Sequence, residues 1–298
     1  MIMKKEVERR IELFKKGYSI KEVSEITGNN YKTVEGTARF YRKRGLKVFK
    51  HINNPINEMF FDKIDSEIKS YLLGFFLADG CIDGSKSKNG NYSNRLLISN
   101  SIDDKETVVK FQKEICPLSK IHEINNQSGV KLRKLQLRLR WTSFYMTNIL
   151  INKYNFSRRK AYDKEFTFPF KTIPNNLIRH FIRGFFDGDG SVDFATPYTK
   201  GGVKSSRFQY GFICTSLPFA EQLSEILCKL SEGISGTITK IEGKTTHWFV
   251  LRFNTKGIKS VEKRYKFYEY LYKDSNVYLS RKKIKFDSFF EYRGKQII

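Results

Sequence analysis

The 298-residue chain is poor in the residues that organise small stapled or zinc-containing proteins. It has only four cysteines and four histidines, and neither set shows the paired spacing of a zinc site. We interpret the scattered cysteines as reduced, mostly buried thiols of an intracellular protein: Cys81, Cys116, Cys214 and Cys228. No apolar run approaches the roughly 18 residues that span a bilayer, and the sequence shows no secretory signal. These absences exclude a zinc finger and argue against a secreted or membrane-spanning protein.

Acidic residues are scarce relative to basic ones. The chain has 55 Lys and Arg against 31 Asp and Glu, which leaves a net charge of +24. Such an excess repels itself in a compact fold unless a polyanion lies nearby. Because 40% of the residues are hydrophobic and 15% aromatic, the chain can build a core and is not disordered. Nucleic acid is the polyanion that this composition favours, and an anionic membrane surface is the competing interpretation.

Residues 1–50 have the pattern of a helix-turn-helix domain. Apolar residues recur at helical spacing in three short stretches, separated by Gly17 and by the turn Gly28-Asn29-Asn30. Ser19 and Glu22 predict a capping box at the start of the second helix. A three-helix bundle for protein contacts is the alternative. The expected DNA contacts lie in the turn and the third helix: Asn29, Asn30, Lys32, Thr33, Thr37 and Arg39.

Residues 51–60 contain Asn53-Asn54-Pro55 and are predicted to be a linker. The rest of the chain is a duplication, with a first half at 61–175 and a second half at 176–298. Aligning Gly74 with Gly184 gives an offset of 184 − 74 = 110. Four blocks occur twice in the same order: 70–83 with 180–193, 96–115 with 211–230, 134–143 with 247–256, and 154–160 with 277–283. Each half alternates helices and strands, which predicts an α+β class.

The first block of each half predicts a buried helix that ends in an acidic glycine turn. The segment 71–78 is apolar on every face, as expected of a helix buried all round. Gly74 and Gly184 lie within these helices, where glycine costs about 1 kcal/mol relative to alanine. We therefore expect the two helices to pack closely at the glycines. Gly80 and Gly190 are predicted to end the helices in turns with positive φ.

This packing would bring Asp79 and Asp189 together at the helix ends. Two adjacent carboxylates repel each other, and a divalent cation with a preference for oxygen ligands reverses that balance. One carboxylate from each half, holding metal ions across a phosphodiester, is the arrangement that in-line hydrolysis requires. The alternative is that both aspartates simply end helices, which the duplication of the motif disfavours.

The blocks LLGFFLADG and IRGFFDGDG resemble the two copies of the LAGLIDADG motif of homing endonucleases. The resemblance extends over about residues 60–298. It implies two pseudo-symmetric αββαββα halves that form a β-saddle, with Asp79 and Asp189 as ligands of Mg²⁺ (or Mn²⁺). The predicted metal site also includes Ala78 and Gly188, which precede the acids. Such single chains act as monomers on long, nearly asymmetric sites in double-stranded DNA and leave short 3′ overhangs. They are commonly encoded in introns or inteins, or stand free in mobile DNA.

The chain departs from the family pattern at several positions. The earlier acid of the motif is present as Asp187 in the second copy and replaced by Leu77 in the first, and Arg183 stands at an alanine position. The family also places a lysine near the cut phosphates of each half. The repeat offers Lys160 in the first half and either Lys282 or Lys283 in the second. Polar residues that order a catalytic water are expected at Asn100 and Thr215.

The saddle surface is predicted from strand periodicity. Between residues 134 and 140, polar side chains alternate with leucines, so the polar ones share one face of a strand. The expected DNA contacts on this face are Lys134, Gln136, Arg138 and Arg140, with Arg252 and Asn254 as weaker counterparts. The polar runs at 84–94 and 196–207 are predicted to be hairpin loops that reach along the groove.

Together these features predict a metal-dependent, site-specific endonuclease that cuts both strands of DNA and resides with DNA inside the cell. Two alternatives use the same scaffold. One is a DNA-binding regulator that does not cut, and the other is an RNA maturase. The presence of both Asp79 and Asp189 favours the nuclease.

Overall fold

The computed structural model describes residues 2–16, 18, 20–42, 44, 56–125, 134–200, 203–230, 236–243, 247–253 and 259–294. The chain divides into two compact units, Met1–Pro55 and Ile56–Ile298. No helix among the described residues is both long enough and apolar enough to cross a lipid bilayer.

The first unit consists of three short helices, α1 (Ile2–Lys15), α2 (Ile20–Thr27) and α3 (Tyr31–Arg42). Its core is small and joins all three helices through Phe14, Ile20, Val23, Val34 and Ala38. Gly28 has φ of +66°, which suits a tight turn between α2 and α3. Ile26, near the end of α2, is exposed. The predicted stop at Gly17, the capping Ser19 and residues 51–55 of the predicted linker lie outside the described residues.

The first half of the second unit begins with α4 (Glu67–Asp79), followed by β1 (Gly80–Ile82) and β2 (Arg95–Ser101). A 3₁₀ turn, η1 (Ile102–Asp104), leads into α5 (Lys105–Ile115), and the half continues with β3 (His122–Ile124), β4 (Gln136–Thr142) and α6 (Phe144–Tyr154). The strands form an antiparallel sheet in the order β1-β2-β4-β3. Two 3₁₀ turns, η2 (Lys160–Tyr162) and η3 (Phe170–Thr172), connect to the second half.

The second half repeats this order. It contains α7 (Asn175–Asp189), β5 (Gly190–Lys200), β6 (Val203–Cys214), α8 (Leu217–Leu230), β7 (Thr237–Glu242) and β8 (His247–Arg252). Its antiparallel sheet has the order β5-β6-β8-β7, which matches the first sheet strand for strand. Two helices follow, α9 (Lys259–Tyr272) and α10 (Ser280–Gly294). The α+β class is thereby confirmed.

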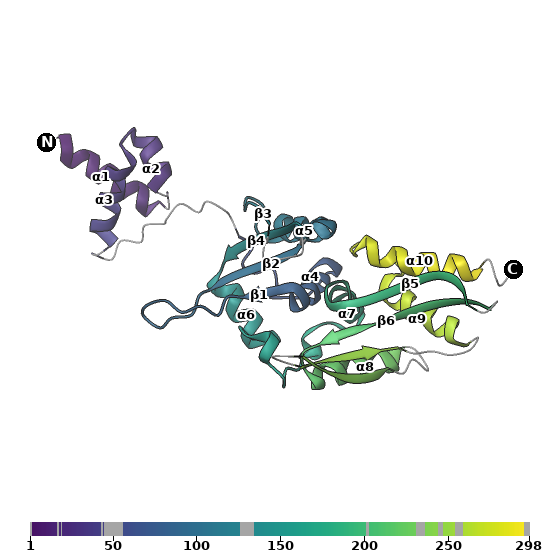
Figure 1. Ribbon diagram of the computed structural model, residues 1–298. Coiled ribbons are helices and arrows are strands. Elements are labelled where there is room, and N and C mark those ends of the chain that lie inside the picture. The colour runs from purple at the N-terminus through teal and green to yellow at the C-terminus, as the bar shows by residue number, and fades with distance from the viewer. Residues whose placement is uncertain are drawn as a thin grey trace. The chain divides into compact units, whose positions relative to one another are not determined.

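Helices α4 and α7 lie side by side between the strands of the two halves (Figure 1). The contact is closest at the two glycines. A Cβ at Gly74 would lie 2.0 Å from the carbonyl oxygen of Phe181, and one at Gly184 would lie 2.0 Å from that of Tyr71. The two helix backbones therefore approach each other closely, as expected. The space between them has no room for a side chain at either glycine.

The glycines that end these helices have a different role from the one expected. Gly80 has φ of −75° and Gly190 has φ of −80°, so neither adopts the predicted positive φ. Both residues continue directly into β1 and β5. A Cβ at Gly80 would lie 2.3 Å from the ring of Phe76, and one at Gly190 would lie 2.3 Å from the carbonyl oxygen of Phe186. Space, and not backbone conformation, therefore demands glycine at both positions.

Equivalent phenylalanines anchor each motif helix to its own half. In α4, the ring of Phe76 lies 5.9 Å from the ring of Trp141 and stacks on Phe156 at 6.1 Å. In α7, the ring of Phe186 lies 5.2 Å from Phe212 and 6.0 Å from Phe286. Each buried aromatic side chain contributes about 1.5–3 kcal/mol. The two helices are thus held rigidly against both sheets.

Candidate active site

The two acidic residues of the repeated motif are the last residues of their helices. Asp79 ends α4 and Asp189 ends α7, and both residues are partly buried. Gly188 explains how the helix ends meet, because a Cβ there would lie 2.2 Å from the Cβ of Ala78 and 3.3 Å from Oδ2 of Asp79. The carboxylate of Asp79 is therefore seated against the end of the opposite helix.

The surroundings of the two acids favour their neutral forms. Burial raises the pKa of Asp79 above its usual value, against the opposing effect of the Lys160 charge. Burial and the charge of Asp79 together raise the pKa of Asp189 to about 7, against the opposing charges of Lys160 and Lys282. A bound cation would offset the desolvation of these carboxylates and the repulsion of Asp189 by Asp79.

Each half supplies one lysine to the end of its own motif helix, with Lys160 partly buried and Lys282 almost completely buried. The Nζ of Lys160 donates to the carbonyl oxygens of Leu77, at 2.8 Å, and Ala78. The Nζ of Lys282 donates to the carbonyl oxygens of Phe186 at 2.6 Å, Gly188 at 3.2 Å and Gly190 at 2.5 Å. A cation at a helix C-terminus is favoured by the helix dipole. Burial lowers the pKa of both lysines, that of Lys282 to about 8.

This geometry decides which lysine of the second half corresponds to Lys160. Lys283 pairs its Nζ with Oδ2 of Asp287 at 3.0 Å, one turn further along α10, and contacts the rings of Tyr268 and Tyr278. It does not join the acids. Lys282 occupies the position equivalent to Lys160, although the aligned blocks pair Lys160 with Lys283 letter for letter.

The two predicted water-ordering residues lie beside the acids and differ in their contacts. Asn100, in β2, donates from Nδ2 to Oδ2 of Asp79 at 3.1 Å. Its own Oδ1 is buried without a hydrogen-bond partner, so an oxygen acceptor is left unused next to the carboxylate. Thr215 follows β6 and lines the same cavity as Asp189.

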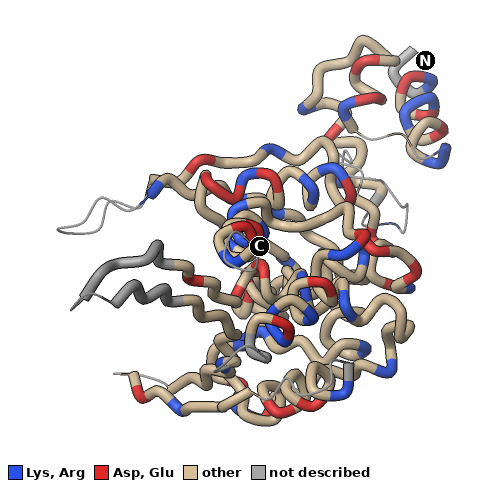
Figure 2. Tube along the Cα trace, turned by 90° about the vertical axis from the view of Figure 1, so that its right-hand side faces the viewer, with Lys and Arg blue, Asp and Glu red and all other residues tan. Residues whose placement is uncertain are grey.

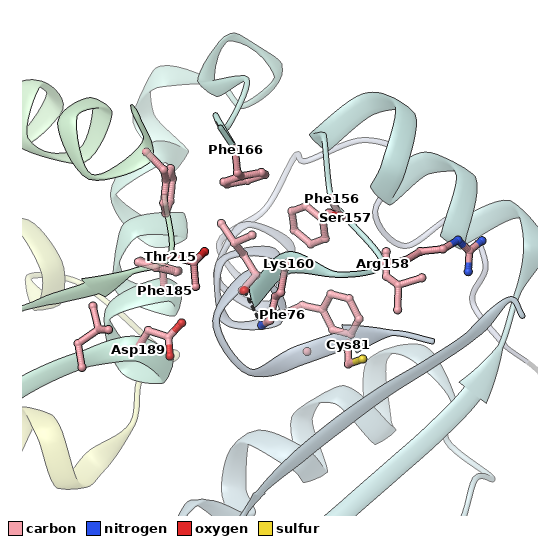
Figure 3. Close-up of a pocket in the computed structure, with 15 residues that line it drawn as sticks. Phe76, Cys81, Phe156, Ser157, Arg158, Lys160, Phe166, Phe185, Asp189 and Thr215 are labelled. Atoms are coloured by element: carbon pink, nitrogen blue, oxygen red, sulfur yellow. Dashed lines mark hydrogen bonds between the residues drawn. The ribbon is translucent and has the colours of Figure 1, made fainter. Parts of the chain in front are cut away.

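That cavity has a volume of about 60 Å³ and lies between the two halves. Asp189 and Thr215 line it from the second half, and Lys160 and Cys81 line it from the first (Figure 3). Five phenylalanines contribute to the remaining wall: Phe76, Phe156, Phe166, Phe185 and Phe219. Asp189 is the acid that lines this cavity, and the apolar side chains of the wall contribute to the burial that raises its pKa.

A divalent cation fits the donors of this site, provided that water and substrate complete its coordination. No cluster of three or more His, Cys, Asp or Glu side chains able to hold a metal occurs among the described residues. Mg²⁺, however, is usually held by one or two carboxylates together with waters and substrate phosphates. Asp79, Asp189 and the unused Oδ1 of Asn100 form such a set. The carbonyl oxygens of Ala78 and Gly188, also predicted as ligands, accept hydrogen bonds from the two lysines.

The predicted DNA contacts on the first sheet are on one face of β4. Leu137, Leu139 and Trp141 are buried, while the alternate side chains of Gln136, Arg138 and Arg140 are partly or fully exposed. Lys134 lies before the strand and pairs with Asp103 at 2.5 Å. Arg252 is exposed at the end of β8, and Asn254 lies outside the described residues. Lys and Arg residues are spread over many elements of this unit (Figure 2).

In the first unit, four of the predicted contacts are exposed, and two are engaged inside the domain. Asn30, Lys32, Thr33 and Arg39 are exposed on or before α3. Asn29 and Thr37 instead accept hydrogen bonds from the buried guanidinium of Arg10, at 2.5 and 3.1 Å. Those two side chains support the fold of the unit.

Two arginines close in sequence to Lys160 and Lys282 were not singled out from the sequence. Arg158 donates to the carbonyl oxygens of Asp83, at 2.8 Å, and Ser93, and so attaches the Lys160 segment to the first hairpin. Arg281 forms a two-point ion pair with Asp104, with distances of 2.5 and 2.9 Å. The sequence repeat could have indicated both arginines, because each follows the serine of the repeated blocks SRRK (157–160) and SRKK (280–283).

Fold and site together define a duplicated α+β protein with one acid and one lysine from each half at a shared centre. Residues 176–266 match the family model described as the LAGLIDADG-like domain, so the resemblance inferred from the two motifs is confirmed. The match covers the second half from α7 into α9.

Comparison with characterised proteins gives more distant likenesses. The chain is 24% identical over 217 residues to the replication factor C small subunit of Methanocaldococcus jannaschii, a match that covers 67% of this chain and 11% of that protein. Among solved structures, I-LtrWI, a LAGLIDADG homing endonuclease bound to target DNA, has a TM-score of 0.49 at 13% identity, covering 77% of this chain and 91% of that one. The meganuclease I-AabMI bound to uncleaved DNA has a TM-score of 0.47 at 14% identity, covering 76% and 91%.

Proposed function

We propose that the protein is a site-specific endonuclease that cuts both strands of DNA with divalent ions held between its halves. The observation that carries this proposal is the meeting of Asp79 and Asp189 at the ends of two closely packed helices, each beside a lysine. A purely structural pair of acids would be expected to separate or to be satisfied by hydrogen bonds, since buried like charges are costly.

Each of the chain's own residues has a distinct part in this proposal. Asp79 and Asp189 hold the ions, and Asn100 adds an oxygen ligand on the side of the first half through its unused Oδ1. When bound, Mg²⁺ or Mn²⁺ supplies an activated water and charge stabilisation at the phosphate. Lys160 and Lys282 place positive charge beside the acids and stabilise the negative charge that develops at phosphorus. Thr215 orders water on the side of the second half.

The remaining basic residues bind the duplex. The exposed alternate residues of β4, together with Arg252, contact bases or phosphates in the groove. The first unit, with Lys32 and Arg39 exposed on α3, extends the binding site and increases the effective concentration of the nuclease at its target. Both halves lie on one chain, so a single copy contains the complete site and acts as a monomer on a long, nearly asymmetric target.

A selection from random DNA tests this function directly. Purified protein is incubated with a randomised duplex library and Mg²⁺ or Mn²⁺, and the cut ends are sequenced. We expect one long, nearly asymmetric site with short 3′ overhangs. Binding without cutting, with either metal, would instead indicate a regulator, and selective binding to a structured RNA library would indicate a maturase.

A further inference from the structure

The segment that carries Lys282 is held by both halves of the protein. Four consecutive residues are each tied to a different group. Leu279 donates its backbone N–H to Oδ2 of Asp187 at 2.7 Å, within the second half. Lys282 itself reaches the end of α7. The two residues between them, Ser280 and Arg281, are bound by the first half.

The contacts from the first half lie where β2 turns into α5. The carboxylate of Glu106 accepts from the backbone N–H of Ser280 at 3.0 Å and from its hydroxyl at 3.3 Å. Ser280 is the first residue of α10, where a helix has unsatisfied N–H groups and a positive dipole end. Glu106 therefore caps the helix that carries Lys282.

The second contact is the ion pair between Arg281 and Asp104. Nε and Nη2 of Arg281 bind the two carboxylate oxygens of Asp104, at 2.5 and 2.9 Å. The carboxylate is almost completely buried, while the arginine side chain is half exposed. A planar two-point contact of this kind fixes both distance and orientation, which a single lysine–carboxylate contact does not. The first turn of α10 is thereby set against the first half.

Lys160 is held differently. Among the described residues, the hydrogen bonds of Arg158 and Lys160 go to the first half: Arg158 binds Asp83, Ser93 and Asn94, and Lys160 binds the end of α4. A hydrogen bond to the second half follows four residues later, where Lys164 donates to the carbonyl oxygen of His247 at 2.6 Å. The two lysines therefore occupy equivalent positions at the site but depend on different supports. A change at Asp104 should move Lys282 and leave Lys160 in place.

We propose that Asp104 is a positioning residue that acts through Arg281 to hold Lys282 at the active site, so that the first half controls the chemistry of the second. This inference rests on the proposed nuclease function, with each lysine serving one DNA strand. Loss of the ion pair should then slow the cutting of one strand more than the other.

The first test measures strand-specific cutting. Asp104→Asn keeps the shape of the side chain and removes its charge. On the target recovered from the random library, with the two strands labelled separately, we expect one strand to be cut about tenfold more slowly, since small displacements of a catalytic group have effects of this size or larger. The other strand should change less than about twofold, so nicked duplex accumulates. Equal slowing of both strands, or no slowing, would overturn the proposal.

Two further variants make the result specific. Arg158→Gln weakens the support of Lys160 and should shift the bias toward the opposite strand. Glu225→Gln, in an exposed ion pair on α8, matches the charge change of Asp104→Asn and should leave both rates unaltered. If Asp104→Asn does not fold, Arg281→Lys keeps the charge while losing the two-point contact, and the same strand bias is expected.

A second measurement needs neither metal nor DNA. Lys282 is almost completely buried, so the neutral amine form of its side chain should react slowly with an amine-modifying reagent. In folded Asp104→Asn, mass spectrometry should show several-fold faster labelling of Lys282 and an unchanged rate at Lys160. Unchanged labelling of Lys282 would overturn the positioning role. If the wild-type protein cuts no DNA while the labelling changes as expected, the nuclease function fails and the positional coupling stands.

Discussion

The guanidinium of Arg183, fully buried in α7, donates to Oε1 of Glu67 in α4 over 2.6 Å. Its other nitrogens donate to the carbonyl oxygens of Leu271 at 2.8 Å and Val277 at 2.7 Å. Glu67 in turn accepts the backbone N–H of Asn276 at 2.8 Å. The arginine at the motif's alanine position thus joins the two motif helices to the turn that precedes α10.

Breaking this pair should destabilise the second unit. Arg183→Met removes the cation and leaves Glu67 with part of its partners, so we expect the free energy of unfolding to fall by about 3 kcal/mol. Urea denaturation followed by circular dichroism measures the change. Glu67→Gln should have a similar cost, and the double variant should cost less than the sum by at least about 1 kcal/mol. Additive costs would show that the two side chains do not depend on each other.

The glycine contact between α4 and α7 should tolerate no side chain. Gly184→Ala places a methyl group 2.0 Å from the carbonyl oxygen of Tyr71, so the helices must separate, and we expect a loss of about 3 kcal/mol or more in thermal or urea unfolding. Gly36→Ala is the matched control. That glycine lies in α3 with open space around it, and alanine there should stabilise the first unit by up to about 1 kcal/mol. A mild effect at Gly184 would mean that the helices are not in close contact.

The acids should be needed for cutting and not for binding. Asp79→Asn and Asp189→Asn each remove a ligand, and we expect the cutting rate to fall at least about 10³-fold while the Kd for target DNA changes little. Chelation of divalent ions should have the same effect and be reversed by added Mg²⁺. Asp287→Asn, which alters an ion pair on α10 away from the site, serves as the control. A parallel loss of binding and cutting would assign the acids a structural role.

Replacement of Lys282 and replacement of its neighbour Lys283 should have very different effects on the cutting rate. Lys282→Met removes the buried ammonium at the end of α7, and we expect cutting to slow about 10²-fold or more. Lys283→Met removes contacts with Asp287, Tyr268 and Tyr278 away from the acids and should change the rate less than about threefold. Single-turnover cleavage of the selected target measures both. The reverse order would place Lys283 at the active site.

Stability should depend on pH through His180. Burial and the adjacent Arg183 lower the pKa of this histidine from 6.5 to about 4, so the folded protein keeps the ring neutral. The unfolded chain takes up a proton below pH 6.5. The contribution of neutral His180 is therefore complete above pH 6.5 and is lost as pH falls toward 4. Relative to His180→Gln, the wild type should lose about 2 kcal/mol over this range. Parallel stability curves for the two proteins would refute the assignment.

The contribution of Asp187 to stability changes with pH in the opposite direction. For this reason the effect of His180 is measured against the His180→Gln variant and not from the wild type alone. Burial raises the pKa of Asp187 to about 6, despite hydrogen bonds from the backbone N–H of Leu279 and the hydroxyl of Tyr71. Its contribution is greatest at low pH and declines as pH rises from 3.8 to about 6. The two effects oppose each other between pH 4 and 6, and only removal of the histidine separates them.

Much of the candidate site could be predicted from local pattern. Periodicity reveals the duplication and the alternation of buried and exposed residues in β4. The absence of a side chain at Gly74 and Gly184 indicates the close packing of the two helices. A sequence displays both properties directly. The expected positive φ at Gly80 and Gly190 was wrong because each motif helix runs straight into a strand, and it is the ring of Phe76 or the backbone of Phe186 that excludes a side chain.

By itself the sequence determined that each half would present one acid at the end of a buried helix, because hydrophobic burial and glycine spacing act within a few residues. Only the tertiary structure decided that Lys282 and not Lys283 faces the site, and that Asp104 holds Arg281 across the halves. Those choices depend on the rotation of α10 about its axis. That rotation is set by contacts between residues up to 177 positions apart, which no local pattern encodes.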